Sequence, residues 1–140
     1  MFCLFGFGTL LRQLKERISL FPEPVLEAAR RNVAVFKRYR HLLQQDSYRL
    51  LDGDKDQPQA IQFVSTSGDE SVVLVFKAES KEGAVQLPLR GLRKNTDYEI
   101  TFANRNQILQ VASNSLLSNG IAVALAQPDT SEVVLMRTRN

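Results

Sequence analysis

The hydrophobic pattern of this sequence changes its period at Gln45. Before that residue, apolar side chains recur every three or four positions, as on one buried face of a helix. After it, short runs rich in β-branched and aromatic residues are separated by turn residues at intervals of about ten, which is typical of a β-sandwich. No strand–helix–strand rhythm follows, so the strands should be antiparallel. We therefore predict a mainly β fold: a helical segment over residues 1–45, followed by an antiparallel β-sandwich over residues 46–140.

A long amphipathic helix of about five turns is predicted after Pro22 and Pro24, because proline is tolerated in the first turn of a helix. The stretch that follows contains no further glycine or proline up to Gln45. Its apolar stripe consists of Val25, Leu26, Ala28, Ala29, Val33, Val35, Phe36, Tyr39, Leu42 and Leu43. A second, shorter helix is predicted over residues 9–19 on the same spacing.

Seven or eight strands are predicted in the second part of the chain. The runs that carry them are 47–51, 60–65, 71–78, 83–87, 97–103, 107–112, 120–126 and 132–137. Residues 72–76 are apolar on both sides, which is typical of a strand in the middle of a sheet. Ile61 with Phe63, and Ile100 with Phe102, alternate with polar neighbours, as expected of strands that have one wet face.

The inventory of reactive side chains excludes several kinds of site. Cys3 is the only cysteine and His41 the only histidine, so an intramolecular disulfide and a Cys/His metal cluster are both excluded. His41 falls near the end of the long helix, where a protonated imidazole interacts favourably with free carbonyl groups. Cys3 lies in an apolar run and is interpreted as a small hydrophobic residue. We predict no catalytic residue, no cofactor site and no metal site in this chain.

An acidic cluster, Asp52, Asp54 and Asp56, has the spacing that opens a calcium-binding loop. Gln57 stands where that loop needs its glycine, however, and Phe63 where it needs a bidentate glutamate. We therefore interpret the cluster as a solvated hairpin turn. Nor does the chain offer the pair of carboxylates that glycoside hydrolysis requires, because its acidic residues fall in turns, on helix surfaces and at strand edges.

Three kinds of partner can be weighed from the sequence. The apolar run 1–11 is much shorter than the roughly 20 residues needed to span a bilayer, so we predict no membrane span. A net charge of +3 permits a nucleic-acid partner. The basic residues of the long helix alternate with its apolar stripe, however, and a solvated face is the preferred interpretation. Aromatic rings suited to sugar stacking are few, because there is no tryptophan and the tyrosines are Tyr39, Tyr48 and Tyr98. This scarcity argues against a carbohydrate-binding module.

Two motifs resemble glycoside hydrolase family 36, the family of many α-galactosidases. At the end of the long helix, Phe36, Lys37 and Arg40 match a Tyr/Phe-Lys-x-x-Arg pattern of that family, and the Tyr-Arg-Leu of the first strand follows at residues 48–50. Further on, Leu-Arg-Gly-Leu at residues 89–92, followed by Tyr98 and Ile100, is similar to a signature of the family's C-terminal sandwich. In this motif we expect Gly91 to allow a tight bend between strands, and Tyr98 to bury its ring while its hydroxyl finds a backbone partner. The segment 116–120 also looks like one near the family's C-terminus.

The resemblance implies that this chain is the C-terminal part of such an enzyme. Residues 1–8 would correspond to the eighth strand of a catalytic (β/α)8 barrel and its following loop, and residues 1–45 to the end of the barrel. The two catalytic aspartates of a retaining α-galactosidase would then lie upstream, so the chain should be a non-catalytic accessory domain whose partner is the barrel.

Four apolar residues of the leader, Phe2, Leu4, Phe5 and Phe7, have too few partners in so short a segment. Burial of one phenylalanine stabilises by roughly 1.5–3 kcal/mol, so we expect the isolated chain to self-associate. Two other functions stay open: a stand-alone carbohydrate-binding module, and a nucleic-acid-binding domain that uses the basic residues Arg30, Arg31, Lys37, Arg38 and Arg40.

Overall fold

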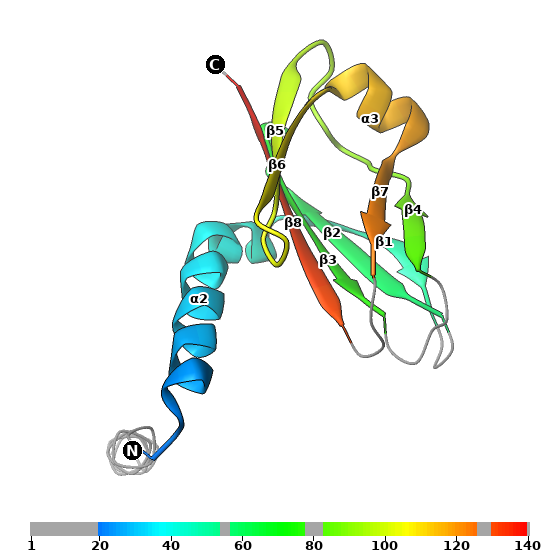
Figure 1. Ribbon diagram of the computed structural model, residues 1–140. Coiled ribbons are helices and arrows are strands. Elements are labelled where there is room, and N and C mark those ends of the chain that lie inside the picture. Colours follow the sequence, from blue (N-terminus) through cyan, green and yellow to red (C-terminus); the bar gives the residue numbers. More distant parts are fainter. Residues whose placement is uncertain (1–19, 54–56, 78–82, 126–129, 140) are drawn as a thin grey trace, which may run out of the picture. The chain divides into compact units, whose positions relative to one another are not determined.

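The computed structural model describes residues 20–53, 57–77, 83–125 and 130–139, and the chain forms two compact units, Met1–Lys37 and Arg38–Asn140. Within the described residues the fold is mainly β, with eight strands in two antiparallel sheets after an N-terminal helix (Figure 1). The predicted fold class is confirmed. The two units divide after Lys37, and the domain boundary proposed between residues 45 and 46 stays a prediction.

Helix α2 (Glu23–Tyr39) makes up most of the described part of the first unit, and its last two residues, Arg38 and Tyr39, belong to the second. It begins where Val25 N–H donates to the carbonyl oxygen of Pro22 over 2.9 Å. An ion pair of 2.7 Å joins Arg30 Nη1 to Glu23 Oε1 across two turns of the helix. The shorter helix predicted over residues 9–19 lies outside the described residues. No helix in the described part of the chain is long and apolar enough to cross a membrane.

The long helix was predicted to reach Leu43, but it ends at Tyr39 and continues as a 3₁₀ turn, η1 (Arg40–Gln44). Tyr39 leaves helical geometry, with φ −122° and ψ −6°. The tighter turn places Leu42 in a small cluster with Val72 and Leu135, where Leu42 is only 3% exposed. Burial of Leu42 against the sheet, which local sequence does not encode, accompanies this change of helix type.

The strands form one large and one small antiparallel sheet. They are β1 (Asp46–Asp52), β2 (Gln59–Val64), β3 (Glu70–Phe76), β4 (Ala84–Leu87), β5 (Asp97–Phe102), β6 (Gln107–Ala112), β7 (Ile121–Ala124) and β8 (Ser131–Thr138). The large sheet has the order β1-β2-β3-β8-β5-β6, and β4 pairs with β7 in the small one. Each predicted run overlaps one of these strands, and β3 lies inside the sheet, between β2 and β8, as its apolar sequence predicted.

The core lies on the face of the large sheet that packs against β4, β7 and helix α3 (Ser113–Asn119). Strand β5 supplies Tyr98, Ile100 and Phe102, all nearly or fully buried. Leu89 and Leu92, from the connection after β4, fill the same core. Figure 1 shows α3 between β6 and β7, so that it links the two sheets at one end of the sandwich. We call this side of the large sheet the inner face and the opposite side the outer face.

The alternation predicted for β2 is reversed in the structure. Ile61 and Phe63 point to the outer face and are half-buried, whereas Ala60, Gln62 and Val64 are buried on the inner face. Gln62 tolerates burial because its amide is fully engaged: Nε2 donates to Ser71 Oγ and to the Arg90 carbonyl oxygen, and Oε1 accepts from Arg90 N–H. The expectation that the apolar residues of a strand face the core was therefore wrong for β2, because the buried Gln62 finds hydrogen-bond partners from elsewhere in the chain.

Helix α3 was not predicted, because its sequence, SNSLLSN, is short and rich in residues that favour turns. Leu116 is buried in the core, and this packing stabilises the helix. The helix ends at Gly120, whose φ of 71° lies in the left-handed region and whose N–H donates to the Leu116 carbonyl oxygen over 2.9 Å. A side chain at Gly120 would also collide with the Leu87 backbone.

Candidate functional site

The outer face of the large sheet is the most distinctive surface of the second unit. Its centre is largely apolar: Phe63, Val72 and Leu135 lie side by side on adjacent strands, and Thr101 continues the row on the next strand. Leu42 of η1 covers part of this row, and Val72 and Leu135 are buried beneath it. The outer face therefore carries a second apolar cluster, smaller than the core on the inner face, and the 3₁₀ turn partly covers it.

Two residues further along each strand, on the same face, lies a row of charged side chains. Glu70, Arg137 and Glu99 stand opposite one another on β3, β8 and β5. Arg137 Nη2 donates to Glu99 Oε1 over 3.2 Å, and Glu70 Oε2 lies 2.7 Å from Nε2 of His41. The charged row is thus held in place by one ion pair and by a contact from the 3₁₀ turn.

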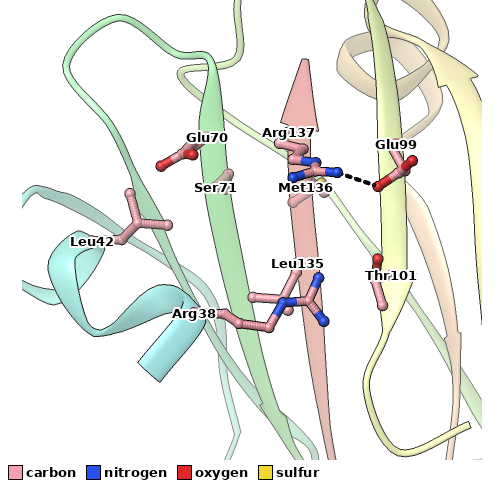
Figure 2. Close-up of a pocket in the computed structure, with 9 residues that line it drawn as sticks. All are labelled: Arg38, Leu42, Glu70, Ser71, Glu99, Thr101, Leu135, Met136 and Arg137. Carbon is pink, nitrogen blue, oxygen red and sulfur yellow. Dashed lines mark hydrogen bonds and ion pairs between the residues drawn. The ribbon is translucent and has the colours of Figure 1, made fainter. Parts of the chain in front are cut away.

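A shallow groove of about 190 Å³ runs between the two rows. Figure 2 shows Arg38 reaching from the end of α2 toward Leu135, with Thr101 on the neighbouring strand and the Arg137–Glu99 pair at the other end. The groove therefore offers guanidinium groups, carboxylates and one hydroxyl around an apolar floor. Such a mixture suits hydrogen bonding to a polar partner, either a protein surface or sugar hydroxyl groups.

A wider polar hollow of about 580 Å³ adjoins the groove and is bordered by Asp69 and Arg93. Arg93 Nη1 donates to Asp69 Oδ1 over 3.0 Å, and this guanidinium, helped by the Ser67 hydroxyl, lowers the pKa of the Asp69 carboxyl below its ordinary value. Beneath them the buried Tyr98 hydroxyl donates to the Gly68 carbonyl oxygen and accepts from Arg93 N–H. Burial raises the pKa of Tyr98, so the phenol stays neutral.

The geometry of Tyr98 agrees with its predicted role, in which the ring is buried and the hydroxyl finds backbone partners. Gly91, predicted to allow a tight bend, has φ 68°, and a side chain there would press on the Tyr48 ring at 3.1 Å. Gly68, with φ 74°, is more tightly confined, because a side chain there would come within 2.7 Å of the Arg93 backbone nitrogen. The family-like motif at residues 89–98 is therefore a structural element that ties two loops together beside the polar hollow.

The described residues around the groove form no nucleophile–base arrangement of the kind used in covalent catalysis. Ser71 Oγ donates to the Phe63 carbonyl oxygen and accepts from Gln62, so it is committed to the fold. His41 contacts Glu70 in an exposed setting, and no hydroxyl or thiol contact of its ring is present among the described residues. Within the same residues no group of three or more His, Cys, Asp or Glu side chains could hold a metal ion.

The remaining residues singled out from the sequence are scattered. Asp52 is exposed and pairs with Arg49 over 3.1 Å in the strand before the predicted hairpin turn, while Asp54, Asp56 and Cys3 lie outside the described residues. Tyr39 and Tyr48 are half-buried and Tyr98 is fully buried, so the tyrosines form no exposed row.

Of the basic residues predicted on the long helix, Arg30 and Lys37 line a groove on α2. Arg30 is engaged by Glu23, whereas Arg38 borders the groove on the second unit.

Sequence reasoning did not find the charged row. Its members come from three runs of the chain that are far apart in sequence, and they become neighbours only because β8 inserts between β3 and β5. The alternation of side chains along a strand predicts which residues share a face of that strand. It does not predict which strands are neighbours, so it could not bring these three residues together. Glu132 was also missed: it is buried, and it accepts hydrogen bonds from Asn104 N–H and Arg105 Nε in the β5–β6 turn.

Comparison with solved structures gives several matches, and those described below are all to α-galactosidases, whereas the sequence matches no protein-family model and no curated protein. The α-galactosidase AgaA from Geobacillus stearothermophilus, of glycoside hydrolase family 36, is 28% identical over 87% of this chain, with a TM-score of 0.72. The galactosidase domain of the α-galactosidase–sucrose kinase AgaSK is 21% identical over 86% of the chain (TM-score 0.67), and the α-galactosidase from Lactobacillus brevis is 18% identical over 88% (TM-score 0.70).

These matches confirm the resemblance to family 36 α-galactosidases that the motifs indicated. The chain spans only about 17% of the length of AgaA and AgaSK and 18% of the Lactobacillus brevis enzyme. It is therefore similar to one small portion of each enzyme, in keeping with a C-terminal domain. Variants of AgaA have been solved in complex with raffinose and with stachyose.

Proposed function

We propose that this chain is the non-catalytic C-terminal accessory part of an α-galactosidase-type glycoside hydrolase, in which the sandwich is attached to a catalytic (β/α)8 barrel. The observation that carries the proposal is the match to AgaA, which covers most of this chain and about one sixth of that enzyme. In this proposal, residues 1–45 complete the barrel and residues 46–140 form the accessory sandwich.

Helix α2 supports this assignment, because none of its residues is buried in the structure of the chain. Val25 and Val33 are 49% and 51% exposed, and Leu26, Ala29 and Val33 line one apolar groove along the helix. An amphipathic helix gains most of its stability from packing of its apolar face. The groove on α2 is therefore the surface that we assign to the barrel.

A chimera tests this proposal: the segment of AgaA that matches this chain is replaced by this chain. We expect the chimera to be soluble and to hydrolyse p-nitrophenyl α-galactoside, and the 140-residue chain alone to show no hydrolysis. Val33→Glu should lower the melting temperature and yield of the chimera, because it places a charge in the apolar groove. Asn32→Glu, at the neighbouring exposed position outside the groove, is the matched control and should change neither.

Two outcomes would count against the proposal. If AgaA shortened by the same segment is as stable and active as the chimera, the segment has no accessory role. Hydrolysis by the chain alone, retained after separation from any host galactosidase, would contradict the non-catalytic assignment.

Carbohydrate binding is a second candidate, favoured by one exposed aromatic ring. Phe76, at the end of β3, is 49% exposed and lies in a hollow of about 320 Å³ with Gln59 and the Arg49–Asp52 pair. An aromatic face beside hydrogen-bonding groups is the usual sugar subsite. Titration with raffinose, followed by NMR shifts of the Phe76 and Gln59 amides, tests it. Absence of shifts, or equal shifts in Phe76→Ser, would remove this candidate.

A further inference from the structure

The large sheet ends in two strands, β1 and β6, whose outer edges pair with no other strand in the described part of the chain. The β1 edge is blunted by a bulge between Arg49 and Leu51 and by charged side chains. The β6 sequence, QILQVA, contains no charge, proline or glycine, and its register with β5 is unbroken. Of the two edges, only β6 therefore lacks the features that prevent strand pairing.

Apolar side chains are exposed on this edge. Ile108 is 60% exposed on the outer face and Leu109 is 38% exposed on the inner face, where Val111 is half-buried. An open edge strand with exposed apolar side chains is a ready template for another strand. Pairing at this edge would remove both apolar side chains and backbone polar groups from water.

The ladder on β5 determines which backbone groups of β6 face the open edge. Ser113 N–H donates to the carbonyl oxygen of Thr96 over 2.8 Å, and the register of β5 with β6 places these residues opposite each other. Bonded and non-bonded pairs alternate along an antiparallel ladder, so Leu109 and Val111 bond to β5. The N–H and C=O groups that point to the open edge are those of Ile108, Gln110 and Ala112.

We propose that β6 pairs antiparallel with the β6 strand of a second copy of this chain, about a two-fold axis through Gln110. In this register Gln110 faces the partner's Gln110, Leu109 faces the partner's Val111, and Ile108 faces the partner's Ala112. Every outward N–H and C=O of the three edge-facing residues then has a partner. The side-chain pairs are apolar with apolar and amide with amide, with no like charges directly opposite.

The neighbouring register, centred on Leu109, is poorer. It would place Ala112 opposite Asn106 of the partner, and Asn106 has φ 51°, outside strand geometry. The turn that holds Asn106 is itself fixed: buried Glu132 accepts from Arg105 Nε at 3.2 Å, and the Arg105 guanidinium lies 4.4 Å from the centre of the Phe102 ring. The start of β6 is therefore preformed and pairs in one register.

The paired surface is small, since it extends one strand by one strand, so the association is weak and depends on protein concentration. It uses only the sandwich unit and no residue of α2. Pairing through β6 therefore depends neither on the proposed attachment to a barrel nor on association through apolar residues of the leader.

Amide hydrogen exchange in the 140-residue chain tests the pairing at the level of single residues. As the concentration rises from micromolar to millimolar, exchange of the Gln110 amide should slow by at least about tenfold, because that N–H becomes bonded across the interface. The Leu109 and Val111 amides, already bonded to β5, are the internal reference and should not change. A Gln110 amide that exchanges at one rate over this range would overturn the proposal.

Charge variants test the register. Ile108→Glu places a charge on the edge and should abolish the concentration dependence at Gln110, while Ser47→Glu on the β1 edge should leave it intact. Adding Ala112→Lys to Ile108→Glu should restore it, because the introduced carboxylate of one copy then faces the introduced ammonium of the other at both ends of the interface. Within one chain these two positions are too far apart along the strand to pair. Failure of the double variant to recover protection would rule out the register through Gln110.

Discussion

Helix α2 and strand β5 bury their apolar side chains to very different extents. No residue of α2 is buried, and Val33 is 51% exposed, whereas Tyr98 and Ile100 of β5 are completely buried. Both elements have an apolar face of the expected period. The difference is that β5 finds its partners within its own unit, and we infer that most of the stability of this chain resides in the sandwich.

Two valine truncations test that difference and should give the largest effect. Val134→Ala removes a fully buried side chain from the inner face of β8 and should lower the free energy of unfolding by about 2 kcal/mol. Val33→Ala, on α2, removes a half-exposed side chain and replaces it by a better helix former, so its effect should be below about 0.5 kcal/mol. Urea unfolding followed by far-ultraviolet circular dichroism measures both. Equal losses would show that the helix is as well packed as the sandwich.

A smaller loss of stability is expected from removing hydrogen bonds of β5 than from removing a buried apolar side chain. Tyr98→Phe leaves the Gly68 carbonyl oxygen and the Arg93 N–H without the hydroxyl and should cost about 1–2 kcal/mol. Tyr48→Phe is the matched control, since Tyr48 is half-buried and its hydroxyl makes no hydrogen bond among the described residues. If the two variants have the same urea midpoint, the Tyr98 hydroxyl contributes nothing to stability.

The smallest effect is expected at the surface of the sandwich and depends on pH. The Arg93 guanidinium and the Ser67 hydroxyl lower the pKa of Asp69, so this carboxylate stabilises the folded chain above its unfolded pKa of about 3.9. That contribution is lost as the pH falls through the lowered folded pKa. Asp69→Asn should therefore lose less stability than the parent chain when the urea midpoint is followed from about pH 5 to pH 2. Asp46→Asn is the control, because Asp46 has no ion pair among the described residues; equal slopes for the parent and Asp69→Asn would refute this role.

The positions of the strands follow from local sequence because each of the eight runs combines β-branched or aromatic residues with flanking turn residues. Hydrophobic period also identified Val72 as part of a central strand and Ile100 as part of the core. The same rule failed at Gln62, where a buried amide depends on Ser71 and Arg90, residues that no local pattern associates with it.

The sequence by itself determined the fold class, the change from helix to strands near Gln45, and the structural role of the motif around Gly91 and Tyr98. These depend on short-range period, on turn chemistry and on one resemblance. The tertiary structure alone decided the strand order, which inserts β8 between β3 and β5 and creates the charged row, and the burial of Leu42 that accompanies the 3₁₀ turn. The strand order also shows that β6 is an edge strand of the large sheet, which its sequence alone does not. The physical reason is that pairing between distant strands depends on the packing of the whole core, whereas period and turn propensity act over a few residues.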